Sequence, residues 1–183
     1  MESPSSTQDR FEIEQTLFRY ARGVDRREWE LVRSIYHPDA IDDHGAYSGG
    51  VEGFIEFLRN RHQNIEQSLH LITNIMIEFG APDAALVESY FICYQRLAST
   101  EKLEKGLNAA TIEPGQTLQI VSVGRYIDRF ERRDSRWAVA SRKVAYDVLE
   151  THTTPLRGGL NPAWILSKRD RSDVLFAKPG EKS

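Results

Sequence analysis

Two residues of this chain carry the side chains that acid–base chemistry requires, Asp25 and His70. An imidazole has an ordinary pKa of about 6.5, so it can accept and release a proton near neutral pH. A neighbouring carboxylate would fix its tautomer and stabilise the imidazolium. The sequence pattern leaves alternatives open for both residues. His70 alternates with Ile72, as a packed core histidine would, and Asp25 fits the N-cap of a helix in which Glu28 completes an Asp-x-x-Glu box.

Tyr20 and Arg125 are further candidates. Tyr20 lies on the core-facing stripe of a predicted helix, where a tyrosine is often half-buried with a solvated hydroxyl. Arg125 alternates with Val123 and Ile127 on a predicted strand, and a guanidinium on such a face needs an anionic partner or ligand. It either faces a pocket or lies outside the barrel, paired with an acid such as Glu88.

Three other polar residues are predicted to contact a bound molecule: His44, Asn74 and Tyr90. Packing is the equal alternative for the last two. His44 follows Asp42 and Asp43, which raises the question of a metal. Adjacent strand residues point to opposite faces, and no recognised ligand spacing occurs, so no metal site is predicted. Gly-rich phosphate loops and nucleotide fingerprints are absent as well, so no cofactor is expected.

Periodicity predicts the elements that position these residues. Helices are expected over about 8–22, 26–36 and 51–62, followed by strands near 40–44, 69–79, 84–98, 117–132 and 136–150, with a loop over 99–116. In the strand 69–79, alternation places the odd-numbered residues on one face and the even-numbered ones, including His70, on the other. Helices followed by long antiparallel strands indicate an α+β fold. A strongly twisted sheet closed by helices creates a cavity, the default ligand site.

The bulk properties exclude several classes of protein. The length of 183 residues suits one domain, and the net charge of −3 gives no general attraction to nucleic acid or to an anionic membrane. No apolar run approaches the roughly 20 residues needed to span a bilayer, and the N-terminus lacks a secretory signal, so we expect a cytoplasmic protein. The one cysteine, Cys93, cannot form an intrachain disulfide and is predicted to be an inert core residue.

Residues 151–183 are predicted to form an extended tail that follows a domain over 1–150. The tail is rich in turns and charge but contains two short apolar clusters, 164–166 and 174–176. Such clusters should pack on the pocket mouth, where Trp164 would contact a ligand, or on a neighbouring subunit. We therefore expect a homo-oligomer, with a trimer favoured.

Several motifs occur in a characteristic order along the chain. They are Tyr20-Ala21-Arg22-Gly23-Val24-Asp25, Tyr36-His37-Pro38-Asp39-Ala40, His70-Leu71-Ile72-Thr73-Asn74, Gly124-Arg125-Tyr126-Ile127-Asp128-Arg129-Phe130-Glu131, Trp137 and Arg142-Lys143-Val144. Over about 8–150 the chain resembles the SnoaL-like family, within the nuclear-transport-factor-2-like superfamily. The similarity is to the branch that contains scytalone dehydratase, bile-acid 7α-dehydratase and hexachlorocyclohexane dehydrochlorinase.

The resemblance implies a cone-shaped α+β barrel, frequently trimeric, with three N-terminal helices packed on a strongly curved, mainly antiparallel sheet. It also implies an Asp–His dyad that eliminates water or halide without a cofactor from a mostly apolar, ring-containing molecule. In this chain His70 would remove the proton and Asp25 would orient His70. Tyr20 would bond the leaving oxygen or the carbonyl, and Arg125 would stabilise the developing anion.

The same fold also serves roles without catalysis. The alternative hypothesis is therefore a small-molecule-binding or structural subunit, similar to the β subunits of ring-hydroxylating dioxygenases. Dehydration is the preferred reaction, while isomerisation or loss of halide could use the same residues.

Overall fold

The computed structural model describes residues 7–98, 113, 115–155, 161 and 163–177. The helices are α1 (Thr7–Arg26), α2 (Trp29–Ser34) and α3 (Val51–Arg61), with the short 3-10 helices η1 (His62–Asn64) and η2 (Val174–Phe176). The strands are β1 (Tyr36–Asp43), β2 (Ser48–Gly50), β3 (Ile65–Ala81), β4 (Ala84–Leu97), β5 (Gln116–Arg133) and β6 (Arg136–Pro155). Most of the predicted loop over 99–116 falls outside the described residues.

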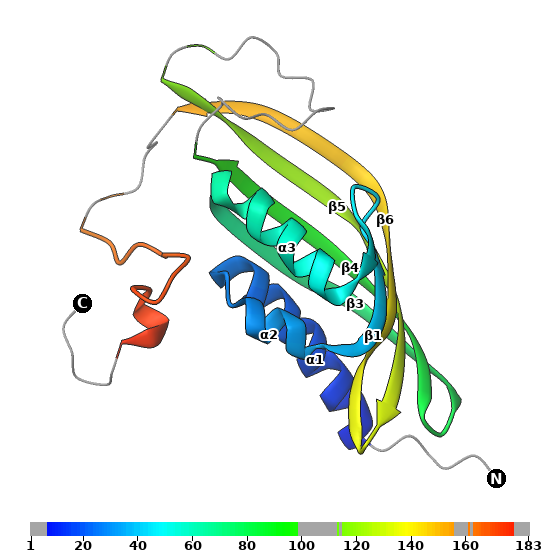
Figure 1. Cartoon of the computed structure of the whole chain (residues 1–183). Coiled ribbons are helices and arrows are strands. Elements are labelled where there is room, and N and C mark those ends of the chain that lie inside the picture. The colour runs from blue at the N-terminus through cyan, green and yellow to red at the C-terminus, as the bar shows by residue number, and fades with distance from the viewer. Residues whose placement is uncertain (1–6, 99–112, 114, 156–160, 162, 178–183) are drawn as a thin grey trace.

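The six strands form one sheet in the order β2-β1-β6-β5-β4-β3. All neighbours are antiparallel except β1 and β6, which run parallel. The sheet curves, and α1, α2 and α3 lie together on its inner face, as Figure 1 shows. The predicted fold, a cone-shaped α+β barrel with three helices on a mainly antiparallel sheet, is confirmed.

Helix α1 carries a continuous apolar stripe. Ile13, Leu17, Tyr20 and Val24 recur at three- and four-residue spacing, and all four are buried. The stripe packs against β3. The helix continues to Arg26, beyond the predicted end, and therefore places Asp25 in its last turn.

Helix α2 begins at Trp29, with Glu28 at its N-cap position and no side-chain cap bond. The predicted helix over 26–36 is therefore too long, and the prediction that Asp25 caps it is wrong. The carboxylate of Asp25 instead contacts β3, as described below. Chain direction changes at Arg27, which has a positive φ of 56°.

Strand β3 contains a bulge that changes which residues face inward. The pairing with β4 shifts register between Thr73 and Met76, and Asn74 has a positive φ of 47°. Such an extra residue reverses the alternation beyond it. Ser68 therefore faces inward before the bulge and Ile77 after it. The prediction that all odd-numbered residues of 69–79 share one face is wrong for this reason.

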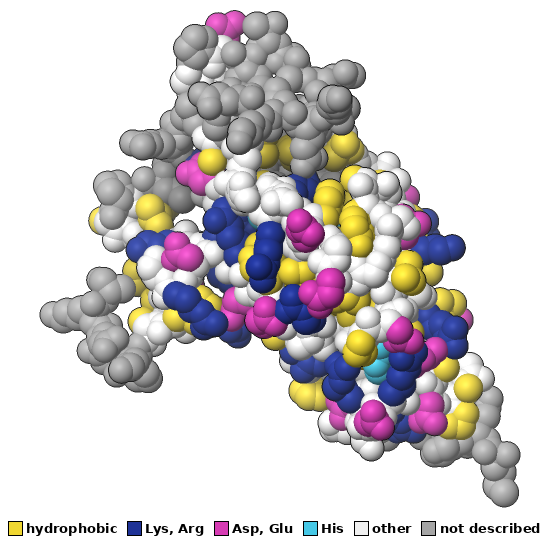
Figure 2. Space-filling view, in the orientation of Figure 1, with side chains coloured by type: hydrophobic (Ala, Val, Ile, Leu, Met, Phe, Trp, Pro, Cys, Tyr) yellow, Lys and Arg dark blue, Asp and Glu magenta, His cyan; other side chains and the backbone are white. Residues whose placement is uncertain are grey.

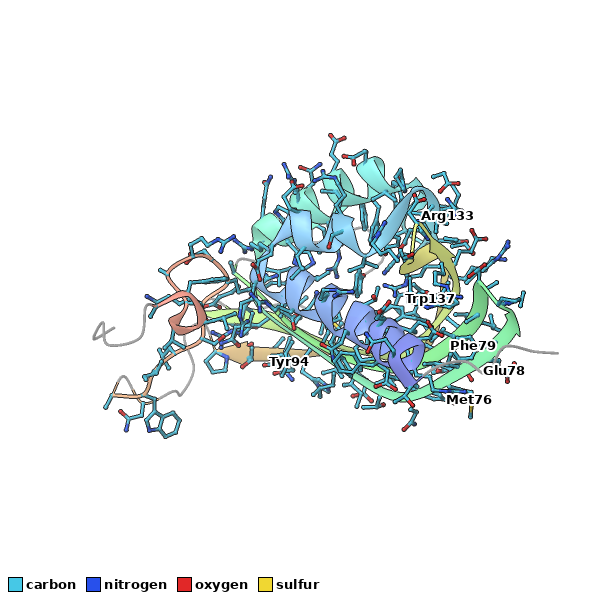
Figure 3. The ribbon with its side chains drawn as sticks, turned by 90° about the horizontal axis from the view of Figure 1, so that it is seen from below. Met76, Glu78, Phe79, Tyr94, Arg133 and Trp137 are labelled. Carbon is cyan, nitrogen blue, oxygen red and sulfur yellow. The ribbon has the colours of Figure 1, made fainter. Side chains whose placement is uncertain are left out.

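Trp137 closes one end of the cone between helix and sheet. Its ring is buried and contacts Phe79 edge-on at 5.8 Å, and its Nε1 donates to Asp9 at the start of α1 at 2.8 Å. In Figure 3, Trp137 and Phe79 lie near each other at one end of the sheet, beside the start of α1.

Among the described residues, the outer face of the sheet carries many exposed apolar side chains. Its exposed large side chains include Leu69, Leu71, Met76, Leu86 and Ile92. The helical side differs, because acidic and basic side chains are interspersed there, as Figure 2 shows. Within the described ranges, no helix combines the length and apolar character needed to cross a membrane.

Candidate active site

Asp25 and His70 meet inside the fold. The buried Asp25 carboxylate accepts three hydrogen bonds: from His70 Nδ1 at 2.7 Å, from the His70 backbone N–H at 2.8 Å and from Ser68 Oγ at 2.9 Å. The last turn of α1 supplies the carboxylate and β3 supplies its three donors. Since Nδ1–H donates to the carboxylate, Nε2 is the ring nitrogen that is not bonded to Asp25.

The surroundings of the pair favour its charged form. Burial alone would raise the pKa of Asp25, but the hydrogen bonds and charge of His70 outweigh it and lower that pKa. Burial alone would likewise lower the pKa of His70. The sulfur of Cys93, which lies opposite His70 on β4, and the Asp25 carboxylate outweigh burial and raise it to about 10. His70 is thus a strong base whose conjugate acid is stabilised in place.

A second Asp–His pair lies across the same interior. The Asp42 carboxylate accepts from His44 Nδ1, and His44 Nε2 is 3.1 Å from the hydroxyl oxygen of Tyr20. Tyr36 donates to the other Asp42 oxygen at 2.5 Å. Burial raises the pKa of Tyr20 far above its ordinary value, so its hydroxyl stays neutral and available as a hydrogen-bond donor.

Both pairs border a cavity of about 490 Å³, a size that suits a small ring-containing molecule. The polar groups of its wall come from Tyr20, His44, His62, His70, Arg61 and Gln95. Its mainly apolar surface comes from Val24, Phe57, Leu58, Phe91, Ile120, Tyr126, Tyr146 and Leu149. The polar groups are few and face a mostly hydrophobic space, as in sites that orient an apolar ligand.

Arg142 is a buried cation beside two tyrosines of the cavity wall. It is fully buried and forms a two-pronged ion pair with Asp128, at 2.8 and 2.7 Å. Its guanidinium carbon lies 4.3 Å from the ring centroid of Tyr20 and 4.2 Å from that of Tyr126. These contacts hold the two tyrosine rings against the cavity wall.

Arg125 does not reach the cavity, and its predicted placement there is wrong. The face of β5 that it shares with Val123 is the outer face, where Arg125 donates to Glu88 at 2.8 Å and lies 3.7 Å from Asp147. Tyr90 lies beside Arg125 on the same outer face, with its ring centroid 5.9 Å from the guanidinium carbon of Arg125. The predicted contact of Tyr90 with a ligand is therefore wrong as well. Alternation showed which residues share a face but not which face is inside.

Two further predicted ligand contacts are also wrong. Asn74 occupies the bulge of β3, where it is exposed and remote from the cavity wall. Trp164 is 60% exposed in the tail and does not border the cavity. His44, by contrast, borders it directly.

Three residues near the cavity were missed as functional candidates. Asp42 lies two positions before His44, so both share a strand face, and this spacing could have revealed the pair. Cys93 was taken for inert core, yet it borders the cavity opposite His70. Arg142 lies in one of the family motifs, but the pattern cannot show that it is buried, because its burial depends on Asp128 from another strand.

The site can now be compared with known proteins. A family model described as the SnoaL-like domain matches residues 5–143. No curated protein matches the sequence.

Solved structures share the fold. A putative scytalone dehydratase from Novosphingobium aromaticivorans is 17% identical, with a TM-score of 0.63, covering 86% of this chain and 95% of that one. A hexachlorocyclohexane dehydrochlorinase from Novosphingobium barchaimii is 24% identical, with a TM-score of 0.61, covering 85% and 96%. A putative aromatic ring hydroxylase from Novosphingobium aromaticivorans is 21% identical, with a TM-score of 0.65, covering 80% and 95%. At these identities the similarity shows the fold alone.

Proposed function

Because this chain belongs to the SnoaL-like family, we propose that it is a cofactor-independent lyase of the dehydratase type. Its substrate would be a mostly apolar, ring-containing small molecule held in the cavity. One observation carries the proposal: the 2.7 Å contact between Asp25 and His70 at the wall of a largely apolar cavity of about 490 Å³.

The proposed reaction uses Nε2 of His70, the ring nitrogen that is not bonded to Asp25. Neutral Nε2 takes a proton from a carbon next to a carbonyl, and the C–H electron pair becomes the new C=C bond as the C–O bond to the hydroxyl breaks. The leaving oxygen takes up a proton and departs as water. Asp25 keeps its charge throughout and stabilises the imidazolium, and together with Cys93 it raises the pKa of His70.

Tyr20 is proposed to donate to the leaving oxygen. Its neutral hydroxyl borders the cavity, and the imidazole of His44, itself bonded to Asp42, lies behind it. When His44 is protonated on both ring nitrogens, its Nε2–H donates to the Tyr20 oxygen and replaces the proton that Tyr20 gives to the leaving oxygen, which leaves His44 neutral. Donors fixed in this way before reaction need no reorganisation in the transition state.

The test starts from a thermal-shift screen of ring-containing alcohols and ketones, because a ligand that binds only the native state raises its stability. Turnover of each hit is then followed by NMR in wild type, His70→Gln and Asp25→Asn. We expect both variants to lose at least about 10²-fold in kcat, the usual contribution of a positioned acid–base group. Wild-type turnover that persists in both folded variants would remove the mechanism.

The alternative is a non-catalytic subunit that only binds a small molecule. In that case the hits would bind without turnover, and His70→Gln would alter affinity alone. The concentration of two Asp–His pairs around one cavity favours the enzyme.

A further inference from the structure

The C-terminal tail places one buried arginine beside the cavity. Arg169 is only 8% exposed, although the residues on either side of it are exposed. Its Nε donates to the Asp25 carbonyl at 2.8 Å, its Nη1 to the Ile65 carbonyl at 2.7 Å and its Nη2 to the Val24 carbonyl at 3.0 Å. All three guanidinium nitrogens are therefore engaged with the backbone around the dyad.

A fourth contact joins Arg169 to the cavity wall. Its Nη2 lies 2.6 Å from Nδ1 of His62. A guanidinium can only donate hydrogen bonds, so Nδ1 of His62 must be the acceptor and carries no proton. The neutral ring then has its proton on Nε2.

His62 is held neutral as well as oriented. It is only 1% exposed, and its ring meets Trp29 edge-on at 5.7 Å. Burial, followed by the charges of Arg169 and Arg61, places the pKa of His62 well below its ordinary value. Within the described part of the chain, the contact with Arg169 is the one hydrogen bond of this ring. His62 borders the cavity, and Nε2–H is the donor that remains on its ring.

The backbone contacts of Arg169 serve the dyad directly. The carbonyls of Val24 and Asp25 lie in the last turn of α1, where carbonyl groups lack intrahelical partners and a cation is favourable. Asp25 is also the residue whose carboxylate holds His70. The arginine therefore fixes the backbone of one side of the dyad while it fixes the tautomer of His62.

We propose that Arg169 is a positioning residue, which keeps His62 as a neutral Nε2–H donor toward the cavity and anchors the backbone of Asp25. The donor would recognise an acceptor oxygen on the ligand, such as a carbonyl. The inference rests on the proposed function only in treating the cavity as the ligand site. The family match ends at residue 143, so Arg169 lies outside the part of the chain that the family model covers.

The experiment reads the histidine rings of the resting, full-length protein. Protein labelled with ¹⁵N-histidine is studied by NMR correlation of ring nitrogens with ring-carbon protons between pH 6 and 8, and His62 is assigned by loss of its signals in His62→Gln. We expect one protonated nitrogen, Nε2, and no titration in this range. In Arg169→Met we expect both nitrogens to average between tautomers, while burial and the charge of Arg61 still hold the pKa of the ring below its ordinary value.

Lys168→Met is the matched control, because it removes a neighbouring exposed cation and should leave the His62 spectrum unchanged. A native ring protonated at Nδ1 or titrating between pH 6 and 8 would overturn the inference, and so would an unchanged ring in folded Arg169→Met. The native spectrum alone decides the tautomer should that variant fail to fold. No substrate is involved, so failure of the proposed reaction would leave this result standing.

Discussion

Neutralising Asp25 should destabilise the protein in a manner that depends on pH. Asp25→Asn keeps the shape of the side chain but replaces a carboxylate that accepts three hydrogen bonds, from Ser68 Oγ and from two nitrogens of His70. Breaking a buried pair of this kind costs about 3–5 kcal/mol. In a chain of this length that corresponds to a fall in melting temperature of roughly 6–20 °C, at about 2–4 °C per kcal/mol.

The pKa shifts define the pH window of the effect. The folded pKa of His70 is raised to about 10, so its stabilisation is complete below the unfolded value of about 6.5 and is lost as pH rises toward 10. The pKa of Asp25 is lowered, so its stabilisation is present above about 4 and is lost as pH falls through the folded value. The difference in free energy of unfolding between wild type and Asp25→Asn should therefore be largest between about pH 4 and 6.5.

Urea denaturation of wild type, Asp25→Asn, His70→Gln and the double variant measures this coupling as a double-mutant cycle. We expect a coupling of roughly 2–3 kcal/mol at pH 6 that shrinks by pH 10. Asp39→Asn, which alters an exposed carboxylate paired with Arg133, is the control and should leave the denaturation midpoint unchanged. A coupling near zero at pH 6, or one that is equal at pH 6 and 10, would refute the reasoning.

Four further outcomes follow. Tyr20→Phe should lower kcat by about 10²-fold, the usual effect of losing one positioned donor, while a melting curve shows the fold intact; unchanged kcat would exclude Tyr20 as the donor. Arg125→Gln should retain wild-type turnover, since its side chain lies on the outer face, and a 10²-fold loss would contradict that placement. Gly124→Ala should lower the free energy of unfolding, measured by urea denaturation, by about 1–3 kcal/mol. The reason is that a Cβ there would lie 2.2 Å from the Ala145 carbonyl oxygen. Equal stability of the two proteins would show that this close approach is absent. The molar mass of the wild type measured by light scattering should be three times the 21.0 kDa of one chain. Trp164→Ser, which removes an exposed apolar ring, should increase the fraction of monomer. A monomeric wild type would refute the trimer.

The fold followed from patterns that depend on local sequence. Spacing of three and four residues revealed α1, and long period-two runs revealed β3 to β6. What alternation cannot show is which face of a strand is inside, because that depends on what packs against the sheet. Arg125 and Tyr90 were misplaced for this reason. Asn74 was misplaced because one extra residue in β3 reverses the faces beyond it.

The candidate site was only partly within reach of the sequence. Family-like motifs pointed to Asp25 and His70, and the structure brings the two together. Asp42 could have been found from its spacing to His44. The role of Arg169 could not have been found from the sequence. Its neighbours are those of a solvated arginine in a charged tail, and nothing in them indicates a contact with Asp25, more than 100 residues earlier in the chain.

In the proposed mechanism, His70 held by Asp25 is the base in the cavity. This role is tested by the pH dependence of kcat/KM in wild type and Asp25→Asn, on the best substrate from the screen. We expect wild-type kcat/KM to rise about tenfold per pH unit up to a limit near pH 10, as the neutral form of His70 becomes populated. In Asp25→Asn the rise of kcat/KM should occur at lower pH, and kcat/KM should level off at a lower maximum. An identical profile in both proteins would contradict the claim.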